Sequence, residues 1–157
     1  MQNVVNEVVV SPFAKVRECP ETGYKSLYAE IAFERGEVIS SFHARETFDR
    51  PSYLTLQISD LQHINIDPEF LQYINHSCNP NVFFDTIAMQ VIALRNIKIG
   101  EEFSFFYPST EWAMDRGFDC ICQSENCLEF IQGAAYISPS ILLDYKLSPH
   151  IRKKLTV

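Results

Sequence analysis

Three cysteines within eight residues constrain this chain more than any other feature of its sequence. Cys120, Cys122 and Cys127 form a Cys-x-Cys-x4-Cys run, and in a reducing compartment such spacing is more typical of metal ligands than of disulfides. Three thiolates are one short of a closed tetrahedral zinc site. The run therefore predicts that a distant part of the chain supplies a fourth ligand. The candidates for that ligand are Cys78, which is the strongest, and the weaker His76 and His150.

The number of thiols indicates what the metal would do. Four thiolates leave no open position for water, which a catalytic zinc ion requires, so we expect one structural Zn²⁺. The alternative is that the thiols are buried and act as small apolar side chains. The fifth cysteine, Cys19, stands apart from the run and is interpreted as a spare thiol near the surface.

Short strands separated by turns dominate the first two thirds of the sequence. Valine-rich or alternating segments predict the strands, and turn residues such as Gly36, Pro68 and Gly100 separate them. Strands are expected over residues 4–10, 25–33, 38–42, 53–58, 64–66, 81–84, 89–94 and 103–106. Many short strands at close spacing predict a mainly β fold and not a parallel α/β one.

Helix signals are concentrated near the end of the chain. Ser138-Pro139 opens a segment over residues 140–146, in which apolar residues recur at helical spacing. Ser148-Pro149 opens a second, short segment that ends in Arg152-Lys153-Lys154. Basic residues suit the negative end of a helix, so two short C-terminal helices are expected.

Composition and charge narrow the class of protein. The 157 residues favour one domain, and 46% hydrophobic residues are enough for a core. The net charge of −7 argues against direct nucleic-acid binding and is compatible with a basic partner. No run reaches the roughly 18 apolar residues that cross a bilayer. Residues 1–10 lack a basic start and do not resemble a signal peptide, so the expected compartment is the cytoplasm, or the nucleus in a eukaryotic host.

Two motifs resemble the signatures of SET-domain lysine methyltransferases. Residues 75–81 read Asn-His-Ser-Cys-Asn-Pro-Asn, similar to the family's Asn-His-Ser-Cys-x-Pro-Asn. Residues 100–107 read Gly-Glu-Glu-Phe-Ser-Phe-Phe-Tyr, which resembles its Gly-Glu-Glu-Leu-Thr-Phe-Asp-Tyr. The three late cysteines look like the family's post-SET segment, in which the motif cysteine, here Cys78, completes a zinc site. Residues 26–29 and 36–39 resemble its opening strand pair, so the resemblance covers roughly residues 10–133.

The resemblance implies a fold that the composition does not suggest. The family folds into several small β-sheets with a pseudoknot, which is an exception to the rule that chains do not thread through their own loops. S-adenosylmethionine lies on one face, and the lysine enters through a channel from the other. On this basis we expect a SET domain over residues 1–108, a zinc-binding post-SET segment over 109–133 and a C-terminal helical extension over 134–157.

Site residues also follow from the resemblance. It implies that Tyr107 is the central catalytic residue and that Tyr53 contributes and lines the lysine channel. Phe105 occupies an aromatic position that influences how many methyl groups fit, and a phenylalanine there favours di- or trimethylation. For Tyr53 and Phe130, the alternative interpretation is that they are ordinary core residues. The candidate cofactor contacts are Lys25, Ser26, Tyr28, Tyr73, Asn75, His76 and Phe130.

The chemistry explains why an aromatic site suits this reaction. A neutral amine attacks a methyl group on a positively charged sulfur, so the enzyme has to align three atoms and exclude water. An apolar channel lowers the pKa of a lysine and favours the neutral amine. A tyrosine with a pKa near 10 is poorly matched to act as a general base at neutral pH, so we expect Tyr107 to orient the amine and stabilise charge.

Three positions depart from the family's pattern. Tyr24-Lys25-Ser26 replaces its Gly-x-Gly, Phe106 replaces the Asp before the catalytic Tyr, and Gln72 stands where an Arg is frequent. We expect a protein or peptide containing lysine as the substrate, recognised by this unit alone or with a second copy of it, so the oligomeric state stays open and a homodimer is one option. The alternatives are an enzyme that acts on a small molecule in a biosynthetic pathway and a SET-like binding module without catalysis.

Overall fold

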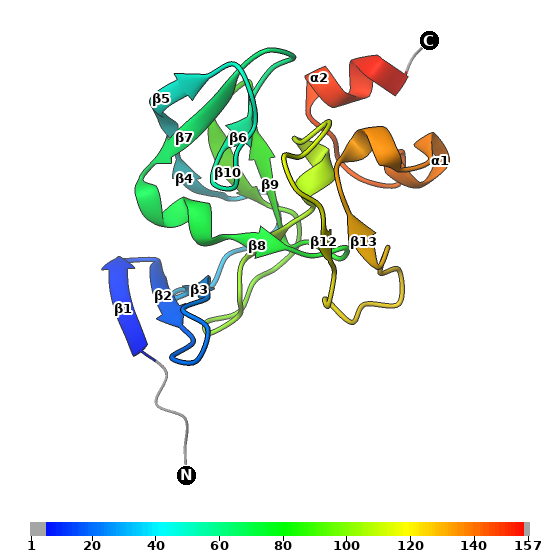
Figure 1. Ribbon diagram of the computed structural model, residues 1–157. Coiled ribbons are helices and arrows are strands. Elements are labelled where there is room, and N and C mark those ends of the chain that lie inside the picture. The colour runs from blue at the N-terminus through cyan, green and yellow to red at the C-terminus, as the bar shows by residue number, and fades with distance from the viewer. Residues whose placement is uncertain (1–5, 156–157) are drawn as a thin grey trace.

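Small β-sheets of two or three strands form the framework of residues 6–155, the part of the chain that the computed structural model describes (Figure 1). A short strand with one apolar face buries little by itself, so several sheets have to pack together to enclose a core. The prediction of a mainly β fold is confirmed. Residues 4 and 5 of the first predicted strand lie outside the described residues.

The first sheet lies at one end of the molecule and has the antiparallel order β1-β2-β3. It is made of β1 (Asn6–Ser11), β2 (Ala14–Glu18) and β3 (Lys25–Ala29). The inner strands alternate in the expected way, because Leu27 and Ala29 are buried while the residues between them are partly exposed.

Two further three-stranded sheets contribute buried residues to the main core. One has the order β4-β10-β9, with β4 (Val38–Ser41), β10 (Gln90–Ala93) and β9 (Val82–Asp85). The other has the order β5-β7-β6, with β5 (His43–Phe48), β7 (His63–Asp67) and β6 (Leu56–Gln57). The turn between β9 and β10 forms because the Asp85 carboxylate accepts the N–H groups of Ile87 and Ala88, each at 2.9 Å.

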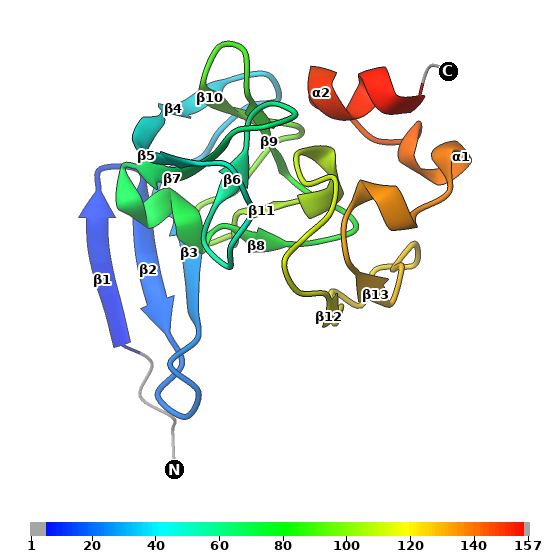
Figure 2. The same cartoon turned by 45° about the horizontal axis from the view of Figure 1, so that its top comes forward.

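A parallel pair of very short strands, β8 (Asn75–His76) and β11 (Ser104–Phe105), crosses the centre of the molecule (Figure 2). The loop after β8 also bonds to β11. The Ser77 N–H donates to the Phe105 carbonyl at 3.0 Å, and Asn81 both donates to the Ser104 carbonyl at 3.1 Å and accepts its N–H at 2.8 Å. Residues 75–81 and β11 thus lie side by side and share hydrogen bonds along the segments that carry the two motifs.

The chain after β11 forms the end of the molecule opposite the first sheet (Figure 1). It contains the hairpin of β12 (Phe118–Asp119) and β13 (Phe130–Ile131), followed by the helices α1 (Pro139–Leu142) and α2 (Pro149–Arg152). Short 3-10 turns complete the structure: η1 (Glu69–Tyr73), η2 (Tyr107–Ser109), η3 (Ala134–Tyr136) and η4 (Lys153–Leu155). Among residues 6–155, no helix has the length and apolar character needed to cross a membrane.

Two apolar clusters stabilise the fold. The larger one joins the sheets β1 to β11, and the smaller one joins the C-terminal segments to residue Phe106. The buried members of the smaller cluster are Phe106, Ala134, Leu142, Leu147 and Ile151. Because Phe106 lies between Phe105 and Tyr107 of the larger cluster, the two clusters meet at the end of the second motif.

Several elements differ from their predictions. β2 and β5 were not predicted, because charged residues interrupt their apolar pattern. They are strands because neighbouring strands pair with them. The strand predicted over 53–58 is only Leu56–Gln57, and the one predicted over 25–33 ends at Ala29. The helix predicted over 140–146 is wrong in length: α1 ends at Leu142, and Tyr145 leaves the helical path to bond with the Cys78 carbonyl.

Candidate functional site

Four cysteines from two distant segments meet beside the pair of β8 and β11. The sulfur atoms of Cys78, Cys120, Cys122 and Cys127 all lie within 4.8 Å of one another, and those of Cys78 and Cys120 are 3.9 Å apart. A tetrahedral zinc site with Zn–S bonds of about 2.3 Å places its sulfur atoms about 3.8 Å apart. The four thiols therefore have the chemistry and the spacing of a closed metal site.

The fourth member of the cluster is Cys78, and neither histidine takes its place. His150 lies elsewhere, with Nε2 2.7 Å from the carbonyl of Thr110. His76 is closer, since its Nε2 is 3.4 Å from the Cys78 sulfur, but its Nδ1 accepts the N–H of Tyr107 at 3.1 Å. Burial lowers the pKa of His76 to about 4. The ring is therefore neutral near pH 7, and Nδ1 is free to accept this hydrogen bond.

Cys78 lies in buried surroundings, where the negative charge of a thiolate is unfavourable unless a positive charge offsets it. Its side chain is fully buried, and burial raises the pKa of the thiol. The N–H of Leu128 donates to its sulfur at 3.3 Å. A thiolate in such a place needs nearby positive charge, which a metal ion supplies.

Tyr107 lies in an aromatic cluster at the end of β11. Its ring centroid is 4.7 Å from that of Phe105, 5.3 Å from that of His76 and 5.7 Å from that of Phe118. Burial is the main reason that the pKa of Tyr107 lies above its ordinary value, and charge on Tyr24, Tyr53 and Glu111 acts in the same direction. The hydroxyl therefore stays protonated at neutral pH and can donate a hydrogen bond.

Four of the predicted cofactor residues are brought together next to this cluster. The side-chain amide of Asn75 donates to the Lys25 carbonyl at 3.0 Å and to the Ser26 hydroxyl at 3.2 Å. The Lys25 ammonium lies 5.1 Å from the ring centroid of Tyr73. These contacts join the edge of β3 to β8 and to the preceding turn, so the four residues lie together although Gly-x-Gly is absent.

The other predicted residues lie further out. Tyr28 shares a face of β3 with Ser26, but its ring lies under the Arg17 guanidinium and its hydroxyl is 3.4 Å from Glu102. Tyr53 is 86% exposed and Phe130 is 51% exposed, so the alternative that they are core residues is wrong. The ring of Phe130 lies against Gly117, where an added Cβ would come within 2.5 Å of it.

Sequence reasoning missed several residues around the site. Phe118 contacts both His76 and Tyr107, and Tyr145 stacks on Phe106. Glu111 is buried, where it accepts the Gln57 N–H at 2.9 Å and the Thr110 hydroxyl at 2.7 Å. None of these residues belongs to a motif. Only the position of Phe118, two residues before the cysteine run, offered a signal.

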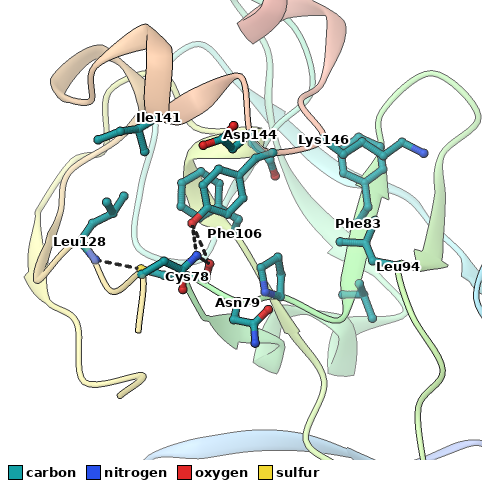
Figure 3. Close-up of a pocket in the computed structure, with 14 residues that line it drawn as sticks. Cys78, Asn79, Phe83, Leu94, Phe106, Leu128, Ile141, Asp144 and Lys146 are labelled. Carbon is teal, nitrogen blue, oxygen red and sulfur yellow. Dashed lines mark hydrogen bonds between the residues drawn. The ribbon is translucent and has the colours of Figure 1, made fainter. Parts of the chain in front are cut away.

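A cavity of about 560 Å³ lies beside the four-cysteine cluster, on the side of Phe106 (Figure 3). The loop after β8, the strand β9 and the C-terminal extension line it, and Cys78, Phe83 and Leu128 are among its lining residues. Tyr107 is not part of the lining. This cavity is therefore separate from the aromatic cluster.

The chain belongs to the SET domain family, since the sequence model of that family, described as "SET domain", matches residues 25–108. Together with the paired strands β8 and β11 and the aromatic cluster around Tyr107, this match identifies a SET-domain methyltransferase. The expected fold and family are confirmed.

Individual relatives agree with this assignment. "Methyltransferase flvH" of Aspergillus flavus is 35% identical over 127 residues, which are 80% of this chain and 71% of that protein. A Candida albicans "Histone-lysine N-methyltransferase, H3 lysine-36 specific" is 35% identical over 78 residues, which are 46% of this chain but only 9% of that protein. A crystal structure of KRYPTONITE with methylated DNA, an H3(1-15) peptide and SAH covers 73% of this chain and 28% of that chain, at 20% identity and a TM-score of 0.55.

Proposed function

We propose that this protein transfers a methyl group from S-adenosylmethionine to the side-chain amine of a lysine in a protein or peptide, and that its four clustered cysteines hold one structural zinc ion. The observation that carries the proposal is the position of Tyr107, whose protonated hydroxyl belongs to an aromatic cluster directly beside Asn75 and His76. The SAH and H3 peptide named in the KRYPTONITE structure and the histone-lysine specificity named for the Candida relative support both the cofactor and the substrate class.

S-adenosylmethionine supplies a methyl group on a positively charged sulfur. In the transfer, the bond from that sulfur to the methyl carbon breaks, a bond from the lysine nitrogen to this carbon forms, and the amine loses a proton to solvent. The protein has to hold the two reacting groups in line and exclude water.

Each group of residues has a part in this scheme. Lys25, Ser26 and Asn75 offer backbone and amide groups to the polar end of the cofactor, and His76 presents its backbone to the adenine. Phe105 and the Tyr107 ring provide the apolar wall that favours a neutral amine. The Tyr107 hydroxyl orients the amine and stabilises charge in the transition state.

Calorimetry followed by a transfer assay tests the proposal. The protein should bind S-adenosylmethionine with a stoichiometry near one, and it should move labelled methyl from this cofactor to a lysine peptide. The peptide with its lysine replaced by arginine is the matched control. No binding at millimolar cofactor would remove the methyltransferase proposal and favour a binding module.

A second candidate is methylation of a small-molecule amine. It is favoured by the match to flvH, because that name gives no histone substrate and this chain covers 71% of that protein, whereas it covers only 9% of the named Candida histone enzyme. Cofactor binding without turnover on histones or total protein would favour this candidate. Comparing a knockout with its parent by mass spectrometry, for both methyl-lysines and methylated metabolites, separates the two substrates.

A further inference from the structure

Phe106, which stands where the family usually has Asp, is paired with a residue of the C-terminal extension. Its ring is 98% buried and stacks on the ring of Tyr145, with the centroids 3.7 Å apart and the planes 3° from parallel. Phe106 is covalently next to Tyr107. The packing of the two rings restrains Phe106, and this restraint acts through the shared backbone on the residue that follows.

The hydroxyl of Tyr145 reaches the other half of the site. It donates to the Cys78 carbonyl at 2.7 Å, and the side-chain amide of Asn126 donates both to the same carbonyl at 2.9 Å and to the Tyr145 oxygen at 3.0 Å. Asn126 directly precedes Cys127. The Tyr145 side chain thus connects two of the clustered cysteines: it bonds to the backbone of Cys78 and to Asn126, the neighbour of Cys127.

The extension also holds the chain just after Tyr107. The Ser148 N–H donates to the Ser109 carbonyl at 2.9 Å, and the His150 ring bonds to the Thr110 carbonyl at 2.7 Å. Contacts from the extension therefore lie on both sides of Tyr107. They come from residues outside the part of the chain that the SET domain model matches.

We propose that Tyr145 is a positioning residue with two effects. Its ring fixes the position of Phe106 and hence that of Tyr107. Its hydroxyl fixes the position of the Cys78 carbonyl and hence that of the loop that carries this cysteine. The catalytic half of this proposal rests on the proposed function, and the metal half does not. The stacking also gives the apolar ring at position 106 a partner in the C-terminal extension. The ring and the hydroxyl have separable effects, so two variants distinguish them.

The metal arm uses Zn²⁺ and a chelating dye. Tyr145→Phe keeps the ring and removes the hydroxyl, and Asn126→Ala removes the second donor to Cys78. Both are expected to lower zinc affinity by about 10-fold, as is common when partners that orient a ligand are lost. Tyr136→Phe, at an exposed tyrosine of the same extension, is the control and should match the wild type. Wild-type zinc affinity in both test variants would overturn the role of the hydroxyl.

The catalytic arm compares Tyr145→Leu with Tyr145→Phe in the full chain, at saturating zinc. Calorimetry with S-adenosylmethionine gives the fraction of protein molecules that can bind the cofactor. The measured turnover is divided by this fraction to obtain kcat per competent site. Tyr145→Leu is expected to lower kcat per competent site by about 10-fold or more with little change in KM, whereas Tyr145→Phe restores kcat because its ring still stacks. Tyr136→Leu is the control.

The outcomes of the two arms are distinct. A lower competent fraction with unchanged kcat per site would show that the stack only stabilises the fold, and this would overturn the positioning role. If the wild type neither binds the cofactor nor transfers methyl, the proposed function fails, and the metal arm alone decides whether Tyr145 organises the cysteine loop.

Discussion

At the scale of single residues, the hydroxyl of Tyr107 is the group on which the proposed chemistry depends. Tyr107→Phe removes one oxygen from a ring that packs against Phe105, His76 and Phe118. The ring itself stays in place, so the variant should fold and bind S-adenosylmethionine as before. Turnover should fall by about 10² or more, because a group that acts in the transition state is lost. Steady-state kinetics with calorimetry on the same sample measure both, and unchanged turnover would contradict the role.

Phe105 should affect how many methyl groups are added. Its ring centroid is 4.6 Å from that of Phe84 and 4.7 Å from that of Tyr107, and the side chain is nearly buried. A hydroxyl added by Phe105→Tyr occupies space and offers a polar partner beside the amine. We expect a shift from di- and trimethylated towards monomethylated product, followed by mass spectrometry at equal turnover. An unchanged product distribution would contradict the prediction that Phe105 limits the space around the reacting amine.

Glu111 makes stability depend on pH. Burial raises its pKa to about 7, from an ordinary value of 4.5. The folded state therefore binds this proton more tightly than the unfolded state between these two values, and the free energy of unfolding falls as pH rises from about 4.5 to 7. A shift of about 2.5 pKa units corresponds to about 3 kcal/mol.

The variant Glu111→Gln tests this dependence. Gln cannot ionise, so the unfolding free energy of the wild type minus that of the variant should decrease from pH 5 to pH 8. His63 and His150, whose pKa values burial lowers, act in the opposite direction but are common to both proteins. Glu34→Gln, at an exposed carboxylate, serves as the control, and urea unfolding at each pH gives the measurement. Parallel profiles for the wild type and Glu111→Gln would show that Glu111 is ionised throughout.

At the scale of elements, the segment that carries the cysteines has little structure of its own. Its hairpin consists of the two-residue strands β12 and β13, and Gln123 and Glu129 adopt positive φ angles of 60° and 71°. On the proposed zinc site, such a segment would gain most of its order from the ion that its ligands share. The short C-terminal helices depend in turn on packing around Phe106, since isolated helices of this length are unstable.

Removing the metal should therefore loosen residues 109–133 before the β-sheets. Zinc-loaded protein treated with a strong chelator is expected to lose amide protection in this segment and to lose S-adenosylmethionine binding, while β9 and β10 stay protected. Hydrogen exchange read by mass spectrometry gives the comparison. Cys120→Ser should reproduce the effect without a chelator, and Cys19→Ser should not. Uniform protection after zinc removal would contradict a structural role for the ion.

At the scale of the whole molecule, the negative charge should favour basic acceptors. The net charge is −7, and long-range attraction between opposite charges is screened by salt. We expect the KM of a basic lysine peptide to rise several-fold between about 20 and 200 mM NaCl, with kcat unchanged. A neutral peptide with the same central lysine is the control. Equal salt dependence for both peptides would mean that the surface charge does not select the substrate.

The sequence predicts the local parts of this molecule better than their assembly. Motif residues 75–81 and the cysteine run indicated the cluster of Cys78 with Cys120, because both belong to recognisable spacings. The pairing of Phe106 with Tyr145 and the burial of Glu111 were not predictable, since they depend on contacts between segments without a pattern. Tyr145 was expected within a helix. Its contacts with Phe106 and Cys78 outweigh the local helical preference of its segment.

The distance along the chain between Cys78 and its partners has a consequence during synthesis. Cys78 and Cys120 are 42 residues apart, so at roughly 5–20 residues per second the ribosome needs about 2–8 s to add the second thiol after the first. The loop that carries Cys78 cannot bond to β11 until residues 104 and 105 have also emerged. During this interval Cys78 is an isolated thiol on an incomplete fold. The yield of correctly folded protein should therefore depend on the redox state and the zinc supply of the translating cell.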